Sequence, residues 1–539
     1  MKKVKMIILA ALSVSALTGI QAQTLYDASR LLDNDLNGTA RFVGMGGAMG
    51  ALGGDISTMG TNPAGIGIYR SNDAMISFGF KSLNTESKLG SSTNETDKFR
   101  GSFDNLGFVF SNKIGNRTAL KYVNFGFNYH KAKSFDKDMA MGGAFSTLKN
   151  GEMITMSQVD VFAAMSQGLK FDYLKSDAAF TDGGSDAAPW LGAMALRTRL
   201  IGTKEGTNDQ YQTNVGFTDD GQGNLVYAPV NGAYRSRERG GVHSYDFNVS
   251  FNFYDRIYLG ATLGAYSVDY SRYSMYSESY NGDASNYSLE NWFDTDGSGV
   301  DFKLGLIVRP FETLPLRIGA AVHTPTWFKL EDRASAIITS DVDMNSNGTI
   351  DYDELYQYDT MDFPGESVNK YELITPWKYN LSLGYTIGQS VALGAEYEYS
   401  DYSTAKLKYD NGSDMVFENN GIKDGLKGVS TWRFGAEFKV VPEFAFRLGY
   451  NNTSASTFSD TFKNLPINTI RTDTEYANRK AINNYTIGFG YRGEMFYADL
   501  AYQYNTYKED FYAFDNVDLP ATKITNSNSQ VLMTLGVRF

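Results

Sequence analysis

Apolar and polar residues alternate with a period of two in segments spread over the whole chain. From Tyr245 to Phe253, every second residue is apolar or aromatic, and the residues between them are Asp, Asn or Ser. Such alternation places one chemistry on each face of a strand. The same reading yields fourteen candidate strands, centred near residues 76, 107, 125, 249, 262, 304, 320, 381, 395, 435, 447, 488, 500 and 534. The sequence therefore predicts an all-β fold.

The lengths of the connections separate a barrel from a sandwich. Alternation alone also suits a soluble β-sandwich with one wet face. Short turns are expected at 255–256, 388–389, 441–443 and 493–494, and long connections at 131–243, 271–298, 330–375, 400–428, 451–482 and 505–526. Short and long connections thus alternate, as in membrane barrels with short periplasmic turns and long outer loops. We predict a 14-stranded antiparallel transmembrane β-barrel, residues 71–539.

The first 22 residues have the layout of a secretory signal peptide. Three lysines precede an apolar run that ends near Leu17, and the small residue Ala22 closes the segment. The run is too short to serve comfortably as a membrane anchor. Cleavage after Ala22 would remove the three lysines and take the net charge from −12 to −15. We expect an exported protein.

Composition and charge exclude several classes of function. The chain has no Cys, which excludes a disulfide scaffold, a thiolate nucleophile and a Cys-based metal site. Its acidic balance argues against binding nucleic acid. Only three His are present, and none lies beside a recognisable nucleophile motif. We therefore expect that the protein is not an enzyme.

The chain ends in an amphipathic segment, 531–539, whose last residue is Phe539. A final strand ending in Phe resembles the signal by which the barrel-assembly machinery recognises outer-membrane barrels for insertion. We expect Phe539 to serve as this signal. The expected location is the outer membrane of a Gram-negative bacterium, with the protein in contact with outer-membrane lipid as a monomer.

Residues 23–70 differ from the rest, because they are rich in Gly and Ala and lack strand alternation. A nucleotide loop is not completed, since Met49 stands where the third Gly of a G-x-G-x-x-G motif belongs. A flexible linker would need neither a fixed Arg nor an Asn-Pro turn. Close spacing of Gly and Ala instead suits backbone packed against backbone. The motif residues are Arg41, Gly44, Gly46, Gly47, Asp55, Asn62, Pro63 and Ala64.

These motifs, Gly-Thr-Ala-Arg, Gly-Met-Gly-Gly-Ala and Asn-Pro-Ala, resemble the N-terminal segment of the FadL family of outer-membrane transport proteins. That family includes long-chain fatty acid and toluene/xylene channels. The resemblance implies that residues 23–70 form a plug, or hatch, inside the barrel. It also implies passive uptake of hydrophobic small molecules, which leave sideways through a gap in the wall. The alternatives are a surface-exposed adhesin or interaction protein, or a haem-binding receptor.

The long connection 131–243, which is the second outer one, contains two candidate helices with apolar faces. One begins near Ser157 and the other near Pro189, a favoured first helical position. One interpretation is an apolar surface that captures ligand at the outer mouth, and the other is that the helices only pack together and cap the barrel. The candidate capture residues are Phe162, Met165, Trp190, Leu191 and Met194.

The fourth outer connection contains a twelve-residue segment, 343–354, that fits the EF-hand calcium loop. Gly348 occupies the position of the sharp turn, and oxygen donors fall at the ligand positions. These are Asp343, Asn345, Asn347, Thr349, Asp351 and Glu354. A solvated acidic turn is the alternative, since Asp-Asn-Gly runs are common in loops. We expect weak Ca²⁺ binding and no required cofactor. A similar run, 294–299, lacks the closing Glu and is interpreted as a turn.

Overall fold

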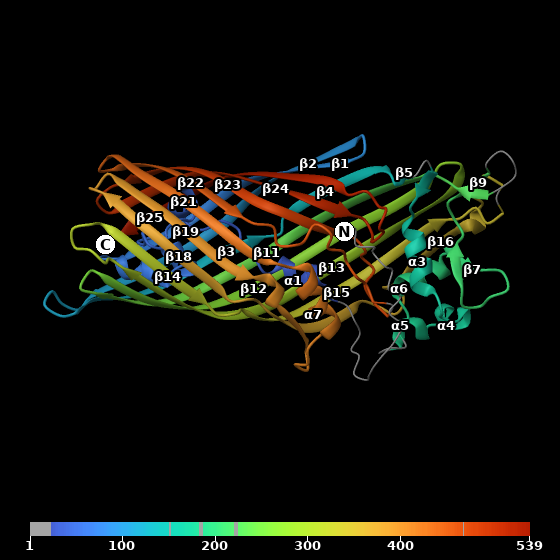
Figure 1. Cartoon of the computed structure of the whole chain (residues 1–539), viewed down its shortest axis with the longest axis horizontal. Helices are drawn as coiled ribbons and strands as arrows, with labels where there is room; N and C mark the ends of the chain where they lie inside the picture. Colours follow the sequence, from blue (N-terminus) through green and yellow to red (C-terminus); the bar gives the residue numbers. More distant parts are fainter. Residues whose placement is uncertain (1–22, 150–151, 183–186, 220–224, 346, 467) are drawn as a thin grey trace, which may run out of the picture.

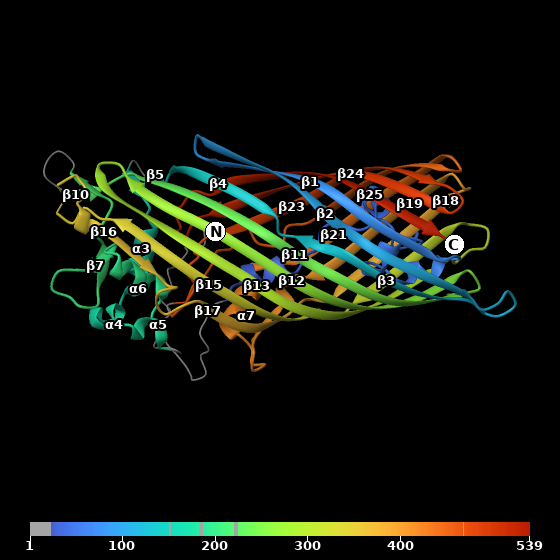
Figure 2. The same ribbon diagram turned by 180° about the vertical axis from the view of Figure 1, so that it is seen from behind.

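The structure is a computed structural model that describes residues 23–149, 152–182, 187–219, 225–345, 347–466 and 468–539. These residues form a closed 14-strand antiparallel β-barrel. The barrel closes where β1 (Asp73–Leu89) pairs with β25 (Thr522–Arg538). Figures 1 and 2 show a long cylinder with tilted strands and a small helical region at one end. The predicted signal peptide lies outside the described residues.

Every predicted strand centre lies in a strand of the wall, so the 14-stranded barrel is confirmed. The remaining wall strands are β2 (Ser92–Lys113), β3 (Leu120–Ser134), β11 (Val230–Phe253), β12 (Ile257–Tyr280), β13 (Asp283–Val308), β14 (Leu316–His323), β18 (Lys378–Ile387), β19 (Val391–Asp401), β21 (Gly428–Val441), β22 (Phe444–Thr453), β23 (Tyr476–Arg492) and β24 (Phe496–Tyr512). Four more continue the wall outward after breaks: β4 (Lys137–Ala144), β15 (Trp327–Asp341), β17 (Ser367–Ile374) and β20 (Lys406–Tyr409).

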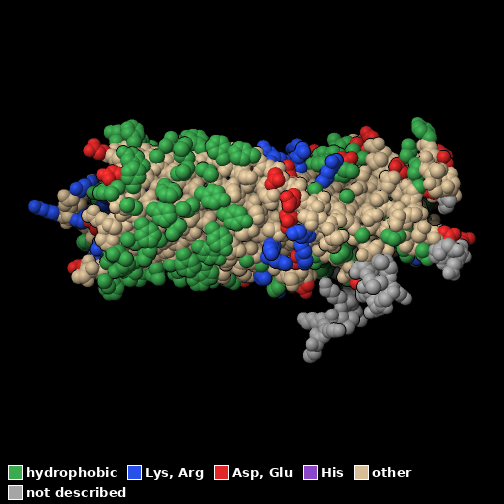
Figure 3. All heavy atoms as spheres, turned by 90° about the horizontal axis from the view of Figure 1, so that it is seen from above, with side chains coloured by type: hydrophobic (Ala, Val, Ile, Leu, Met, Phe, Trp, Pro, Cys, Tyr) green, Lys and Arg blue, Asp and Glu red, His purple; other side chains and the backbone are tan. Residues whose placement is uncertain are grey.

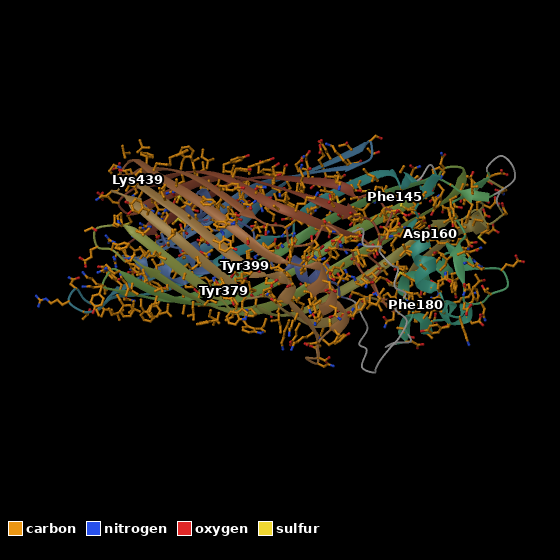
Figure 4. All side chains as sticks on the ribbon, viewed as in Figure 1. Phe145, Asp160, Phe180, Tyr379, Tyr399 and Lys439 are labelled. Carbon is orange, nitrogen blue, oxygen red and sulfur yellow. The ribbon has the colours of Figure 1, made fainter. Side chains whose placement is uncertain are left out.

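An apolar belt surrounds one half of the barrel (Figure 3). It consists of the outward side chains of the wall strands, such as Leu381 and Leu500, which are 62% and 46% exposed. Tyr379 and Tyr399 pair across β18 and β19 at its outer edge, whereas Lys439 lies near the opposite end of the barrel (Figure 4). Apolar side chains facing outward from a closed sheet belong in lipid, so the alternation seen in the sequence marks the transmembrane part.

Beyond the belt the wall continues as paired strands. The connection expected at 271–298 is instead a hairpin, because β12 and β13 stay paired up to a tight turn at Asn281 and Gly282. Gly282 has φ +96°, a conformation that a turn of this kind requires. The run 294–299, interpreted as a turn, lies in the middle of β13. It is held straight there by ladders to β12 on one side and β15 on the other.

A cap of short elements covers the outer end of the barrel. Its helices are α3 (Gln158–Ser166), α4 (Phe171–Lys175), α5 (Ala178–Thr181) and α6 (Trp190–Arg197), joined by β5 (Ser146–Lys149), β6 (Glu152–Thr155), β7 (Ile201–Thr203), β8 (Tyr211–Thr213), β9 (Phe217–Asp219) and β10 (Leu225–Tyr227). Nearby connections contain η4 (Tyr352–Glu354), β16 (Leu355–Asp359), η5 (Tyr402–Thr404) and α7 (Val416–Gly425). Among the described helices, none combines the length and the apolar character needed to cross a membrane.

The helix start expected at Ser157 is confirmed. The Ser157 side chain accepts a hydrogen bond from the backbone N–H of Val159 and donates one to Glu278 of β12. Glu278 also accepts from the backbone N–H of Gln158, at 2.7 Å. A buried carboxylate on the wall therefore anchors the first turn of α3. Pro189 is the N-cap residue of α6 rather than its first helical residue.

The N-terminal segment lies inside the barrel. It contains α1 (Leu25–Arg30), α2 (Ala40–Gly44), η1 (Ile56–Gly60) and η2 (Pro63–Ile68), and it ends where β1 begins. Most of its side chains are buried, including Ala40, Met49 and Ile66 at 0% exposed. We call this segment the plug.

Candidate functional site

The plug packs against the wall through facing glycines. Gly46 has φ +61°, and a Cβ atom on Gly449 of β22 would lie 2.1 Å from the Gly46 nitrogen. A Cβ on Gly46 would lie 2.7 Å from the Tyr450 nitrogen, and one on Gly44 would lie 3.3 Å from the Gly488 Cα atom. Plug backbone therefore touches wall backbone directly, as the spacing of small residues indicates.

Arg41 ties the plug to the wall by charge. Its Nε lies 3.0 Å from Glu437 Oε2, and its Nη1 donates to the Gly54 carbonyl at 2.9 Å. Arg447 binds the same Glu437 oxygen at 2.7 Å and Asp499 at 2.6 Å. Two guanidinium groups thus share two buried carboxylates inside the barrel. Each charge has an opposite partner, as burial requires.

The remaining motif residues fix the turns of the plug. Asp55 accepts from the Thr39 hydroxyl and from the Ser57 N–H, which joins α2 to η1. Asn62 accepts from the Ala64 N–H and donates to the Leu306 carbonyl of β13, at 3.3 Å. The Pro63 carbonyl accepts from two further wall side chains, Asn248 and Ser250. The structure therefore brings the predicted motif residues together inside the lumen; Gly47, with φ +80°, lies in the turn after α2.

Around the plug, the lumen at the level of the belt is polar. A cavity of about 130 Å³ lies there between plug and wall. Lys303 lies 2.8 Å from Asp246 and 3.2 Å from Asp301, with all three side chains buried. His130 and His323 line the same cavity. An apolar solute moving along this lumen would displace water from charged groups, which is unfavourable.

A second cavity, of about 190 Å³, lies further out between the plug and the extended wall. We call it the outer cavity. It is lined by seven basic side chains: Arg30, Lys133, Lys137, Arg272, Lys463, Arg471 and Arg479. Five acidic side chains also line it: Asp27, Glu238, Asp473, Glu475 and Glu509. Bases therefore exceed acids, in a chain whose net charge is −12.

Ion pairs in the outer cavity join the plug to an outer loop. Arg471 lies 2.6 Å from Asp473 and 3.4 Å from Asp27 of α1. Arg272 of β12 pairs with Asp473 and, at 3.4 Å, with Glu475. Burial, the largest effect, lowers the pKa of Lys463. Among the described residues, Arg272 Nε and the hydroxyl of Thr457 are buried and have no hydrogen-bond partner.

The outer cavity was not predicted from the sequence. Its charges come from α1, several strands and the loop before β23, so no spacing in the chain groups them. One signal was present: Arg471, Asp473 and Glu475 alternate with two Thr, Thr472 and Thr474, at the end of a long connection. Alternating charges there indicate a segment with one strongly charged face.

The wall has a gap between β2 and β3. Their ladder ends where Asn105 pairs with His130, although β2 stays paired with β1 for its whole outer length. Beyond the break, β4 pairs with β11. Side chains bridge the gap instead of backbone: Lys98 lies 2.9 Å from Asp138, and Arg100 lies 3.6 Å from Asp136. The rings of Phe103 and Tyr129, 5.4 Å apart, stack beside its lower end.

The plug fills part of this gap with residues 33–37, which we call the edge segment. Asp35 N–H donates to the Ala132 carbonyl at 2.8 Å, and the Asp35 carboxylate accepts from the Ser134 N–H at 3.0 Å. Asn37 Nδ2 donates to Asp104 of β2 and to the Lys131 carbonyl of β3, each at 3.0 Å. The edge segment therefore supplies partners to β3 where β2 no longer does.

The residues expected to capture ligand are mostly buried in the cap. Phe162, Leu191 and Met194 are 0% exposed and Trp190 is 6% exposed, while Met165 packs at the edge of the same cluster. Phe145 and Phe180 belong to this cluster too (Figure 4). Their burial contradicts the interpretation as a capture surface and supports the alternative, in which the helices pack together and cap the barrel. The helices pack against each other and against the extended wall, because the wall continues beyond the belt and offers them an apolar inner face.

In the calcium-loop segment, side-chain oxygens of the described residues accept hydrogen bonds from within the loop. Gly348 has φ +79°, and Asp343 accepts from the Gly348 N–H at 2.7 Å. Glu354 accepts from the N–H groups of Met344 and Asp351, each at 2.9 Å. Asn345 and Asn347 direct amide nitrogens at Asp351, and Asn347 accepts from the Thr349 N–H. Within the described residues, no group of three or more acidic or His side chains is arranged to hold a metal. Calcium binding stays a prediction.

Comparison with known proteins is informative at the level of structure. No family model and no curated protein matches the sequence. A FadL homologue of Pseudomonas aeruginosa matches with a TM-score of 0.50 and 13% identity, over 97% of this chain and 100% of that one. Toluene transporters also match: TbuX of Ralstonia pickettii (TM-score 0.44, 13% identity, 94% of this chain and 99% of that one) and TodX of Pseudomonas putida (0.46, 11%, 94% and 99%).

At these identities a structural match shows the fold alone. The match to the Pseudomonas aeruginosa homologue spans nearly the whole of both chains. It agrees with the closed 14-strand antiparallel barrel. This chain therefore has the fold of the FadL family of barrels.

Proposed function

We propose that this protein is a passive channel in the outer membrane of a Gram-negative bacterium that takes up hydrophobic small molecules, long-chain fatty acids in particular. One observation carries the proposal: the wall gap opens beside a plugged, polar lumen. The channel needs no cofactor for this role, since diffusion down a gradient requires none. The likeness to barrels named as toluene transporters is a likeness of fold.

The polarity of the lumen supports a sideways route. A hydrophobic solute gains no free energy by moving from water into a charged, water-accessible space such as the one around Lys303 and Asp246. The plug also blocks that path, since Arg41 and the facing glycines hold it to the wall. The gap lies at the outer edge of the apolar belt, where lipid is the adjoining phase. Leaving through it keeps the apolar part of a solute out of the polar lumen.

The outer cavity supports a ligand with an acidic head. Seven basic side chains line it, and the buried Arg272 Nε has a donor to spare among the described residues. A carboxylate can accept from such donors in a low-dielectric site. Met139, Tyr234 and Phe511 line the same cavity and offer apolar surface to the start of an alkyl chain. An uncharged aromatic hydrocarbon would leave the basic groups without a new partner, so we favour the fatty acid.

The experiment closes the gap and measures uptake. The chain has no Cys, so Lys98→Cys with Asp138→Cys introduces a single pair across the gap. A short bismaleimide should join them in intact cells of a deletion strain that expresses the variant. Uptake of a labelled long-chain fatty acid should fall at least about tenfold, because a covalent bridge replaces an ion pair that can open.

The matched control is Thr506→Cys with Ser527→Cys. These residues are paired across β24 and β25, which backbone hydrogen bonds already hold together. Cross-linking them should leave uptake unchanged. Normal uptake through a fully cross-linked gap would refute the sideways route. Uptake of toluene in place of the fatty acid would refute the choice of ligand and leave the route intact.

A further inference from the structure

Four lysines form a cluster on the outside of the barrel, just beyond the apolar belt. They are Lys480 of β23, Lys508 of β24, Lys523 of β25 and Lys88 of β1, and all four are exposed. These strands are consecutive neighbours in the wall and include the seam where the barrel closes. Figure 3 shows a band of charged side chains at this boundary of the belt. We call these residues the lysine cluster.

The height of the lysine cluster follows from the strand below it. Along β24, the outward residues Leu500, Tyr502 and Tyr504 are 46%, 42% and 36% exposed, and Lys508 follows them on the same face. Four residues of strand span roughly 13 Å, less along the barrel axis because the strand is tilted. The Tyr residues mark the interface between the acyl chains and the lipid head groups. Lys508 therefore lies at about the height of the head-group layer, beyond the acyl chains.

The lysines are short of counter-charges. Lys523 and Lys480 share one carboxylate, Asp510, at 2.9 and 3.2 Å. Lys88 lies 2.7 Å from Glu86, which precedes it on the same strand face. Among the described residues of β23, β24, β25 and β1, these two carboxylates serve four ammonium groups, and the next carboxylates on this face, Glu95 and Asp97, lie on the neighbouring β2. The whole chain has a net charge of −12, so the excess of positive charge on these four strands is opposite to the average of the chain.

The pairing of β1 with β25 adds a cost that a bound anion would remove. Lys88 and Lys523 are direct partners across the two strands. Like charges placed directly opposite each other destabilise a sheet. An anion between or above them would turn this repulsion into two attractions. The arrangement therefore favours a multivalent anion outside the wall over water.

We propose that the lysine cluster binds the phosphate groups of the phosphorylated glycolipid that forms the outer leaflet of the membrane. Its apolar tails lie along the belt residues below, and its phosphates reach the four ammonium groups. Lysines near an anionic membrane surface attract it individually and in proportion to their number. This site lies outside the wall: it rests on the outer-membrane location given in the proposed function, but not on transport.

The test measures lipid binding to the purified full-length barrel in detergent micelles. Native mass spectrometry would count bound lipid A, with phosphorylated and dephosphorylated lipid A as the two probes. The barrel should retain the phosphorylated form at least about tenfold better. The triple variant Lys480→Gln, Lys508→Gln, Lys523→Gln should lose this preference. Added inorganic phosphate should compete weakly, because it lacks the tails that the belt holds.

A matched control removes the same charge from the other end of the barrel. The triple variant Lys113→Gln, Arg117→Gln, Lys121→Gln lies at the turn between β2 and β3. It should retain the preference for phosphorylated lipid. Equal retention of both lipids by the parent barrel, or equal losses in the two triple variants, would overturn the proposal. Heat-modifiable gel mobility verifies that each variant is a folded barrel. The single variant Lys508→Gln removes a lysine that makes no ion pair among the described residues. It should show a smaller loss of the preference for phosphorylated lipid.

Discussion

Two junctions of the same wall are closed in different ways. At the seam, β1 is paired with β25 by backbone from Asp73 to Lys88. At the gap, β2 is paired with β3 from Asn105 to Lys113, and side chains and the edge segment replace the ladder beyond that point. A ladder opens only if many backbone groups lose partners in lipid, whereas side-chain contacts can exchange one at a time. The difference shows where a wall of this kind can open without unfolding.

The largest effect is expected when the plug loses its charged anchor. Arg41→Met leaves the buried Glu437 with Arg447 alone. We expect the free energy of unfolding in detergent to fall by about 3 kcal/mol, since removing one partner of a buried ion pair leaves the other charge incompletely compensated in a low-dielectric interior. Denaturant titration measures it. Arg256→Met, which removes a pair with the exposed Glu312, should cost less than about 1 kcal/mol. A similar cost for both would show that the plug is not held by this contact.

The second prediction distinguishes gap from seam directly. Asp35→Ala with Asn37→Ala removes the side-chain hydrogen bonds of the edge segment to β2 and β3, worth about 1 kcal/mol each, and keeps the backbone hydrogen bond from Asp35 to Ala132. We expect hydrophobic dye to enter cells several-fold faster, because the gap then depends on fewer contacts. Thr85→Ala removes a hydrogen bond to Asn526 at the seam and should change nothing. Equal leakage through both variants would mean that the two junctions do not differ.

The third prediction concerns pH and the outer end of the plug. Burial and the charge of Asp27 raise the pKa of Asp332 to about 7. Because the folded pKa lies above the usual 3.8, the stabilising contribution is complete below pH 3.8 and is lost as pH rises through 7. We expect the free energy of unfolding to fall by about 1 kcal/mol from pH 6 to pH 8.

Asp332→Asn should flatten this pH dependence, because the amide does not titrate. The groups that face Asp332 include the side chains of Gln23, Thr295 and Tyr371, which donate to it, and the charged Asp27, Arg30 and Arg471. Stability measured at several pH values for both proteins gives the comparison. An unchanged slope in the variant would assign the pH dependence to another group.

The smallest effect is expected at the calcium-loop segment, far from both junctions. We expect Ca²⁺ to bind with a dissociation constant on the order of 10⁻⁴ to 10⁻³ M, in the range of extracellular modules. Isothermal titration of the intact barrel measures it, and Glu354→Gln should abolish the heat. Glu366→Gln, a charge change in the same outer connection, should retain it. The absence of heat from the parent protein would contradict calcium binding and support the alternative, a solvated acidic turn.

The wall and the plug could be predicted because their signals are local. Alternation located each strand, and close Gly spacing around Gly44 and Gly46 indicated backbone packing that the structure contains. The start of α3 was also readable, because Ser157 caps it through its own side chain. Each of these depends on residues close together in the chain, where period and propensity decide the conformation.

The gap and the outer cavity could not be predicted, because each depends on residues brought together by the barrel. Lys98 and Asp138 meet across strands that alternation alone would have paired by backbone. Asp27 and Arg471 come from opposite ends of the chain. The sequence could not decide between the two interpretations of the cap residues for a related reason. Nothing near Trp190 or Met194 in the sequence reveals that distant strands extend past the belt and cover them.

The extended wall has a consequence for the resistance of the barrel to proteases. β12 and β13 remain paired by backbone hydrogen bonds up to the turn at Gly282, well beyond the belt. A protease must bind several residues of extended chain in its active site. A strand that is paired on both sides can enter only after its backbone hydrogen bonds to the neighbouring strands are broken. Cleavage should therefore be confined to the connections at the rim, such as the one around Met361, whose side chain is 56% exposed. The paired strands in the outer half of the barrel should therefore stay intact when proteases cleave exposed loops.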